Sequence, residues 1–452
     1  MLRTIVWMMA ISLGAMETLG AQELPRRGVL GVGFKPVPAE VASQLGLEQG
    51  RGVIAMKPIA GLTGDRAGIQ EGDLIASIQG KPIEMATVAS IVRELPSGEP
   101  TTFSIFRQGK AMELTTNLQE KARDPGNERY EVIYSHVVSH GKRMRTIITK
   151  PKSSGAHPGL LFIQGFSPVS YDFTLEGSRG DVGTIDGPIL SSLANAGYVT
   201  LRVEKPGVGD SEGGPFADVD FTTELDIYRQ ALKQLKGLDG VDRNQVFIFG
   251  HSMGGAFGPM LASENRVRGI AVYGVAARTW FEYLADTLRY QGLVAGDNLE
   301  NADEKVRQGM RIMSLALFEN MSADEIKSKH PQLEPMTDAL LPQGMFSGKT
   351  LDFWRQLANT NMASYWTQAN THVLAVRGAS DFVTYDVDHK LVADIINSVK
   401  PGWGKSMTLP ESDHLFHRFA TEQQSMQNFQ RGAFNSSFTE LLMNWLEEVR
   451  NG

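Results

Sequence analysis

From residue 130 onward, short apolar runs alternate with longer amphipathic stretches. Short apolar runs separated by helical patterns indicate buried, mostly parallel strands with helices on both faces of the sheet. We therefore predict an α/β fold for residues 130–452. The expected strands are 130–138, 143–149, 160–163, 198–203, 246–249, 269–273, 371–376 and 405–409, and the expected helices are 188–196, 222–235 and 256–262.

Residues 27–118 have a different pattern. A glycine-punctuated apolar run is followed by a short helical stretch, a strand at 52–58, a loop, a second helix and a final pair of strands. This order predicts a small α+β domain. Residues 119–129 are polar, contain Pro125 and Gly126 and lack apolar periodicity, so they are expected to be a linker.

The first residues are typical of a secretory signal peptide. Arg3 precedes an apolar stretch at 5–13, and Leu19, Gly20 and Ala21 form a small-residue cleavage site. We expect residues 1–21 to be removed and the protein to be periplasmic or secreted. The alternative is an uncleaved anchor, but the apolar stretch is shorter than the roughly 20 residues of a spanning helix. No other window approaches that length, so no membrane span is expected in the mature chain.

Composition excludes several classes of protein. The 452 residues are 42% hydrophobic and 21% charged, with a formal net charge of -7. Basic residues are scattered, so no nucleic-acid partner is expected. Cysteine is absent, which excludes a thiol nucleophile, disulfides and a cysteine-ligated metal. We expect neither a metal nor a cofactor.

The segment VFIFGHSMGG at 246–255 matches the G-x-S-x-G nucleophile elbow, in which a serine lies on a sharp turn between a strand and a helix. Ser252 is the candidate nucleophile. Gly250 and Gly254 stand two residues on either side, where a side chain would collide with the backbone of the turn.

A serine nucleophile needs a base within hydrogen-bond reach and an acid that orients this base. In the α/β-hydrolases, whose nucleophile elbow this segment resembles, the three residues follow in the chain order serine, acid, histidine. Asp381 lies in a loop after the strand at 371–376, so it is the candidate acid. Asp386 and Asp388 are the rival acids, but they stand where a helix begins and where acidic residues favour the helix dipole.

The candidate base is His414, which follows the strand at 405–409 and a polar turn. His417 is its rival and lies deeper in the following segment. His251 cannot turn back onto the hydroxyl of its neighbour, and Asp413 is read as a loop residue. The oxyanion donors are expected to be the backbone amides of Met253, which follows the nucleophile, and Phe166, in the loop after the strand at 160–163.

With these residues in order, 130–452 resembles the α/β-hydrolase superfamily. The glycine-rich segment 202–213 is similar to a loop that shapes the pocket wall in that superfamily. Gln164 stands where relatives commonly have histidine, which leaves a backbone oxyanion donor intact. The long stretch at about 275–370 is read as a largely helical cap, with a helix at 302–318 and another that begins at Ser322 with a capping box to Glu325.

The aromatic and other large apolar residues of the cap have two interpretations: they line an apolar acyl pocket, or they form the core of the cap itself. The residues concerned are Trp280, Phe281, Tyr283, Leu284, Met310, Met313, Met345, Phe346, Phe353, Trp354, Tyr365 and Trp366.

Residues 27–118 resemble a bacterial PDZ domain of the HtrA-like type. The resemblance is carried by the segments RAGI at 66–69, GDLI at 72–75 and GKP at 80–82. It implies that a peptide adds to a sheet edge while backbone amides capture its terminal carboxylate. The alternative is that the glycines only permit tight turns and the domain docks on its own partner. The expected peptide-binding loop is Gly28, Val29, Leu30, Gly31 and Val32.

The sequence as a whole predicts an exported serine hydrolase that cleaves small acyl esters, most simply a carboxylesterase. The same machinery would serve a serine peptidase or amidase. A third reading is a catalytically silent envelope protein that binds a peptide or a protein C-terminus through the PDZ-like domain.

Overall fold

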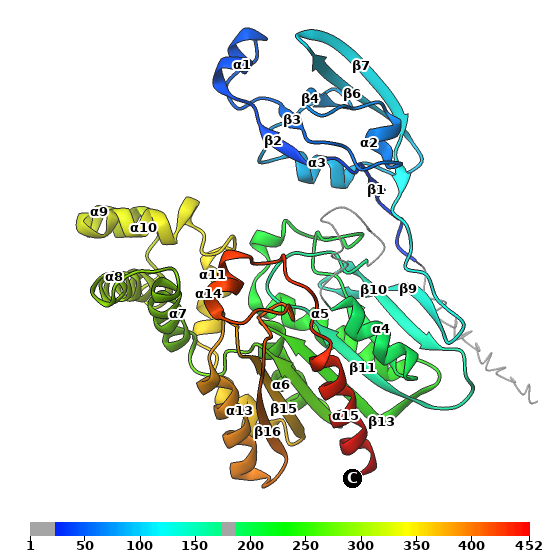
Figure 1. The fold of residues 1–452 in the computed structure, drawn as a ribbon, viewed down its shortest axis with the longest axis vertical. Coiled ribbons are helices and arrows are strands. Elements are labelled where there is room, and N and C mark those ends of the chain that lie inside the picture. Colours follow the sequence, from blue (N-terminus) through cyan, green and yellow to red (C-terminus); the bar gives the residue numbers. More distant parts are fainter. Residues whose placement is uncertain (1–22, 173–185) are drawn as a thin grey trace, which may run out of the picture.

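The computed structural model describes residues 23–172 and 186–452. The expected signal peptide, 1–21, lies outside the described residues. Figure 1 shows a small β-rich unit above a larger α/β unit, with the helices between about 280 and 360 set to one side. No helix among the described residues combines the length and hydrophobicity needed to cross a bilayer.

The larger unit is built on an eight-stranded sheet with the order β16-β15-β14-β13-β11-β12-β10-β9. Strands β11 to β16 pair in parallel, whereas β10 pairs antiparallel with both β9 and β12. This mixed sheet confirms the predicted fold class. The strands are β9 (Tyr130–Ser139), β10 (Lys142–Pro151), β11 (His157–Ile163), β12 (Val199–Val203), β13 (Val241–His251), β14 (Gly269–Tyr273), β15 (His372–Gly378) and β16 (Gly404–Leu409).

Helices cover both faces of this sheet, and each face has its own apolar core. Side chains of α5, α6 and α13 pack on one face, and side chains of α4 and α15 pack on the other. The bounds are α4 (Gly187–Asn195), α5 (Phe221–Gly237), α6 (Gly254–Glu264), α13 (Asp386–Val399) and α15 (Ser437–Asn451), with the short α14 (Glu422–Gln427) before α15.

The predicted cap lies between β14 and β15 and is helical. Its second helix spans Leu299–Leu317, three residues earlier at its start and one shorter at its end than the predicted 302–318, and Ser322 and Glu325 form the predicted capping box. Both readings of its aromatic residues hold in part, since Phe353 and Trp366 are fully buried while other rings face a cavity described below. The helices are α7 (Trp280–Val294), α8 (Leu299–Leu317), α9 (Ala323–Lys329), α10 (Glu334–Leu340), α11 (Leu351–Ala358) and α12 (Met362–Gln368).

The N-terminal unit has its own sheet, in the order β2-β3-β4-β6-β7 with β5 paired to β4, and its own apolar core. A separate two-stranded pair joins β1 to β8. The strands are β1 (Gly28–Val29), β2 (Phe34–Pro36), β3 (Val53–Ala55), β4 (Leu74–Ile78), β5 (Lys81–Pro82), β6 (Pro100–Arg107), β7 (Lys110–Asn117) and β8 (Gln119–Glu120), and the helices are α1 (Ala39–Gln44), α2 (Thr63–Arg66) and α3 (Val88–Glu94).

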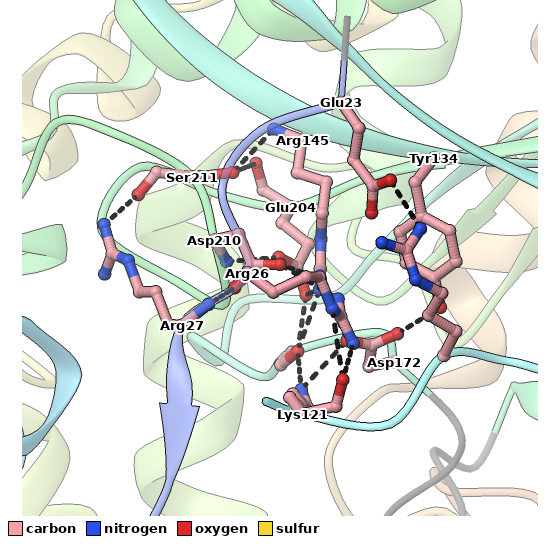
Figure 2. A network of polar contacts seen from close by, with 12 residues as sticks. Glu23, Arg26, Arg27, Lys121, Tyr134, Arg145, Asp172, Glu204, Asp210 and Ser211 are labelled. Atoms are coloured by element: carbon pink, nitrogen blue, oxygen red, sulfur yellow. Dashed lines mark hydrogen bonds and ion pairs between the residues drawn. The ribbon is translucent and has the colours of Figure 1, made fainter. Parts of the chain in front are cut away.

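A buried charge cluster joins the start of the N-terminal unit to the larger unit (Figure 2). The guanidinium of Arg26 lies 2.8 Å from the carboxylate of Asp172 and 2.9 Å from that of Asp210. Arg145, on β10, contacts both carboxylates and lies 2.5 Å from Glu204. These side chains are at most 1% exposed, so the segment before β1 is anchored in the larger unit.

Candidate active site

Ser252 lies at the turn between β13 and α6, with a φ of 53° that side chains rarely adopt. The two glycines are required by space: a Cβ on Gly250 would lie 2.7 Å from the Gly254 carbonyl oxygen, and one on Gly254 would lie 2.1 Å from that of Ile163. The Ser252 amide donates to the Tyr273 carbonyl at the end of β14, 2.8 Å away. The turn is therefore sharp and held to the neighbouring strand.

The structure brings the three predicted side chains together. His414 Nε2 lies 2.9 Å from Ser252 Oγ, and His414 Nδ1 lies 2.9 Å from Asp381 Oδ2. A carboxylate only accepts hydrogen bonds, so Nδ1 carries the proton and Nε2 presents a lone pair to the serine hydroxyl. This arrangement suits proton removal from Ser252.

Asp381 is fully buried and accepts several hydrogen bonds. The Thr384 hydroxyl donates to Oδ2 at 2.6 Å, and the amides of Val383 and Thr384 donate to Oδ1 at 2.7 and 3.0 Å. Burial opposes its charged form, yet His414, the Thr384 hydroxyl and the charge of Arg377 hold the pKa of Asp381 well below its usual range. Burial likewise opposes protonation of His414, but the Asp381 carboxylate more than offsets it and raises the pKa of His414.

The rival residues have other contacts. The nearest acid to His417 is Asp413, 3.8 Å away, and Asp413 accepts the amides of Leu415 and His417, which organises the loop that carries His414. Asp386 and Asp388 lie in the first turn of α13. Asp388 accepts the amides of Ala277 and Arg278 at 2.9 and 3.0 Å and so anchors the start of the cap.

The loop after β11 passes directly against Ser252. A Cβ on Gly165 would lie 3.3 Å from Ser252 Cβ, so a side chain there would crowd the nucleophile. Among the described residues, the amides of Met253 and Phe166 have no hydrogen-bond acceptor. Two free amides beside a nucleophile are what an oxyanion requires. The side-chain amide of Gln164 donates to the Val203 carbonyl at 3.0 Å, so this departure from the superfamily pattern holds the loop to β12.

A cavity of about 310 Å³ opens at Ser252 between the sheet and the cap. One face of α7 lines it, from Trp280 to the polar Thr287 and Gln291. None of its described lining residues comes from 202–213, so the expectation that this loop forms the pocket wall is wrong; the loop wraps the buried Glu204 instead. The other apolar lining residues include Phe166, Met253, Ala256, Tyr283, Leu284, Phe346, Trp354, Leu357 and Met362.

Sequence reasoning missed two residues that shape this site. Gly274, directly after β14, has a φ of 63°, and a Cβ on it would lie 2.8 Å from the His414 ring. The Tyr273 hydroxyl donates to the Asp413 carbonyl at 2.7 Å, which ties β14 to the histidine loop. The sequence signal that could have identified Gly274 is its position immediately after a buried strand.

The five residues of the predicted peptide-binding loop divide into two groups. Gly28 and Val29 form β1, and the Gly28 amide points to the Leu95 carbonyl. The amides of Leu30, Gly31 and Val32 have no acceptor among the described residues. In the part of the chain that the structure describes, no group of three histidine or acidic side chains could hold a metal ion.

The sequence model of the alpha/beta hydrolase family matches residues 160–428, which is more than half of the chain. The protein therefore belongs to the alpha/beta hydrolase family.

Among curated relatives, Esterase EstD of Thermotoga maritima is 28% identical over 166 residues, which is 36% of this chain and 38% of that protein. A probable periplasmic serine endoprotease DegP-like of Rhizobium meliloti is 35% identical over 94 residues, 21% of this chain and 18% of that protein. The chain thus spans less than half the length of either relative. Among solved structures, Est1E from Butyrivibrio proteoclasticus aligns over 71% of this chain and 99% of its own, with 14% identity and a TM-score of 0.43.

Proposed function

We propose that this protein is an exported carboxylic ester hydrolase that works through an acyl-enzyme on Ser252. His414 Nε2 accepts the hydroxyl proton as Ser252 Oγ attacks the acyl carbonyl carbon. The amides of Met253 and Phe166 hold the oxyanion. When the tetrahedral intermediate collapses, His414 returns the proton to the leaving alcohol, and water then releases the acid by the same steps in reverse order.

The observation that carries this proposal is the continuous line of hydrogen bonds from Ser252, which lines the cavity, through His414 to the buried Asp381. The negative charge of Asp381 favours the imidazolium that forms when His414 takes the proton, because the two groups are buried together. The pKa directions of both groups support these roles.

The cavity favours a small ester over a polypeptide. Its volume of about 310 Å³ is at the lower end of the range for small-molecule sites, and cap residues such as Trp280 and Trp354 form part of its wall. A serine peptidase or amidase of the same fold is the alternative, since the chemistry of acyl transfer is shared. EstD, the esterase relative, favours the ester.

Matched p-nitrophenyl esters and p-nitroanilides with acetyl and butyryl groups test the proposal. We expect turnover of the esters and at least about a 10⁵-fold loss of kcat in Ser252→Ala, as for other serine hydrolases that lose the nucleophile. Ser167→Ala, an exposed hydroxyl on the neighbouring loop, is the control and should keep its activity. Faster hydrolysis of the anilides would favour the amidase, and full ester turnover by Ser252→Ala would refute the mechanism.

We also propose that the N-terminal unit is a PDZ-like domain that binds peptide C-termini. Two observations support this: β2 ends the strand order and has a free outer edge among the described residues, and the adjacent amides of Leu30, Gly31 and Val32 lack acceptors. An added strand and a captured carboxylate would use both features.

Fluorescence polarisation with a peptide library tests this second proposal. Binding should need a free C-terminal carboxylate and be lost on amidation. Gly31→Ala should weaken binding because its φ is 69° and its Cβ would lie 2.6 Å from Leu62, whereas Gly46→Ala, with a φ of 67° and open space, is the matched control. Equal binding of free and amidated peptides would exclude carboxylate capture. Export is tested separately by fractionation of cells that express the full chain.

A further inference from the structure

A second cluster of buried charges lies beside the candidate active site and takes no part in the proposed chemistry. Lys205 Nζ lies 2.7 Å from Glu224 Oε1, and Lys349 Nζ lies 3.4 Å from Glu224 Oε2. All three side chains are at most 1% exposed. They come from three separate parts of the fold: the end of β12, helix α5 and the cap. Burying two ammonium groups around one carboxylate is costly, so the remaining contacts of each group matter.

The two lysines have different second partners. Lys205 Nζ donates to the carbonyl of Phe166 at 3.0 Å. Lys349 Nζ donates to the carbonyls of Val219 and Phe216 at 2.6 and 3.2 Å, and it lies over the Phe216 ring. Only Lys205 therefore contacts the loop after β11, which carries the candidate oxyanion donor.

Two of the groups bonded to the Phe166 Cα, the carbonyl group and the side chain, are held by contacts with other residues. Its carbonyl accepts from Lys205, and its ring packs 5.2 Å from the ring of Trp354 and 5.9 Å from that of Phe353. When the carbonyl carbon and Cβ are both fixed, tetrahedral geometry fixes the direction of the Cα–N bond and leaves the N–H only rotation about that bond. The preceding residue, Gly165, gives no such restraint, because glycine permits many backbone conformations.

The rest of the loop is tied to the same strand end. The Gln164 side chain donates to the Val203 carbonyl, and Glu204 accepts from the amide of Tyr171 at 3.1 Å. Three consecutive residues, 203–205, thus hold the loop along its length, and Lys205 holds it at Phe166. Without this bond, the loop stays anchored at both ends and by the Phe166 ring, but the Phe166 carbonyl loses its ammonium donor.

We propose that Lys205 is a positioning residue for ester hydrolysis: its ammonium, fixed by Glu224, holds the Phe166 carbonyl so that the Phe166 amide is preset toward the oxyanion. This inference rests on the proposed function of Ser252. Lys205 touches no reacting atom; it acts through the backbone of Phe166. Preset donors stabilise the transition state because they need no reorganisation when charge develops.

The test compares Lys205→Met with Lys349→Met. Each substitution removes one ammonium and leaves the other paired with Glu224, so the charge change is matched, but only the first releases Phe166. Three quantities are measured: the melting temperature, kcat and KM for p-nitrophenyl acetate, and the inhibition constant of a trifluoromethyl ketone, which forms a tetrahedral alkoxide on the serine. Lys205→Met should lower kcat about 10- to 100-fold, somewhat less than outright loss of an oxyanion donor.

KM should change less than about threefold in Lys205→Met, and the inhibition constant should rise by the same factor as kcat falls, since both report the oxyanion. Lys349→Met should keep kcat and the inhibition constant within about threefold of wild type, even if its melting temperature falls as much as that of Lys205→Met. A merely structural role for Lys205 would lower the melting temperature without this joint change.

Two outcomes would overturn the inference: kcat in Lys205→Met no lower than in Lys349→Met, or a fall in kcat with wild-type inhibition by the ketone. If Lys205→Met does not fold, Glu224→Gln replaces it: this variant removes the charge that fixes both lysines, and Lys349→Met controls for the part that concerns Lys349. Unchanged kcat and inhibition in Glu224→Gln would also overturn the inference. Failure of the proposed function is distinct, because wild-type protein itself would then show neither ester turnover nor inhibition.

Discussion

The imidazole of His251 hydrogen-bonds the backbone carbonyl of His414, with 2.9 Å between Nε2 and the oxygen. A carbonyl only accepts, so His251 carries its proton on Nε2. Burial, with a smaller effect from the nearby His414, lowers the pKa of His251 to about 3. His251 therefore stays neutral near neutral pH. Although it is the sequence neighbour of Ser252, it supports the candidate base through the hydrogen bond to the His414 backbone carbonyl.

Replacing His251 with phenylalanine should remove this support while keeping the volume filled. We expect kcat for a short ester to fall about tenfold with little change in KM, the cost of one lost hydrogen bond that orients a catalytic group. His417→Phe is the control, because His417 lies near Asp413 and has no contact with Ser252. Steady-state kinetics decide the matter; an equal loss in both variants would contradict the account.

Gly274→Ala should damage the site more than the fold. The new Cβ would lie 2.8 Å from the His414 ring, and the φ of 63° adds about 1–2 kcal/mol of backbone strain. Gly402→Ala carries the same kind of strain at a φ of 82° with nothing within 4 Å. Both variants should lose similar stability in denaturant titrations, but only Gly274→Ala should lose most of its esterase activity. Normal turnover in Gly274→Ala would mean that His414 does not work from this position.

The pH dependence follows from the pair His414 and Asp381. Only neutral His414 accepts the serine proton, so kcat/KM should rise with pH through the raised pKa of His414 and then level off. Asp381→Asn removes the charge that raises this pKa, so the midpoint should move to lower pH. The plateau should also drop by about 10⁴-fold, because an amide no longer selects the required tautomer. A pH–rate profile with an unmoved midpoint would assign the acid role elsewhere.

The Arg26 cluster should contribute to the stability of the larger unit, even though Arg26 precedes the N-terminal unit. Arg26→Met leaves the carboxylates of Asp172 and Asp210 short of one buried cation, which typically costs about 3–5 kcal/mol. Arg143→Met, which breaks an exposed pair with Glu212, should change the free energy of unfolding very little. Chemical denaturation of both variants checks this; equal stability would show that the cluster is not a structural anchor.

Local pattern was sufficient for the strands, the capping box at Ser322 and the elbow at Ser252, because each depends on neighbouring residues. The three candidate site residues could be chosen because the carboxyl ends of parallel strands meet at one edge of a sheet. Contacts between distant segments gave no such signal: His251 and His414 are 163 residues apart, and Arg26 and Asp210 are 184 apart. The hydrophobic periodicity of a helix or strand indicates which of its faces is buried, but not which distant segment packs against that face.

The most direct test of the central claim is covalent labelling of the native protein with a fluorophosphonate, followed by intact-mass and peptide mapping. We predict one phosphonyl group per wild-type chain, on the peptide that contains Ser252, and no adduct on Ser252→Ala under the same conditions. Labelling should also be slowed strongly in His414→Ala, since the base is missing. Equal labelling of Ser252→Ala, or an adduct on another serine, would contradict the account.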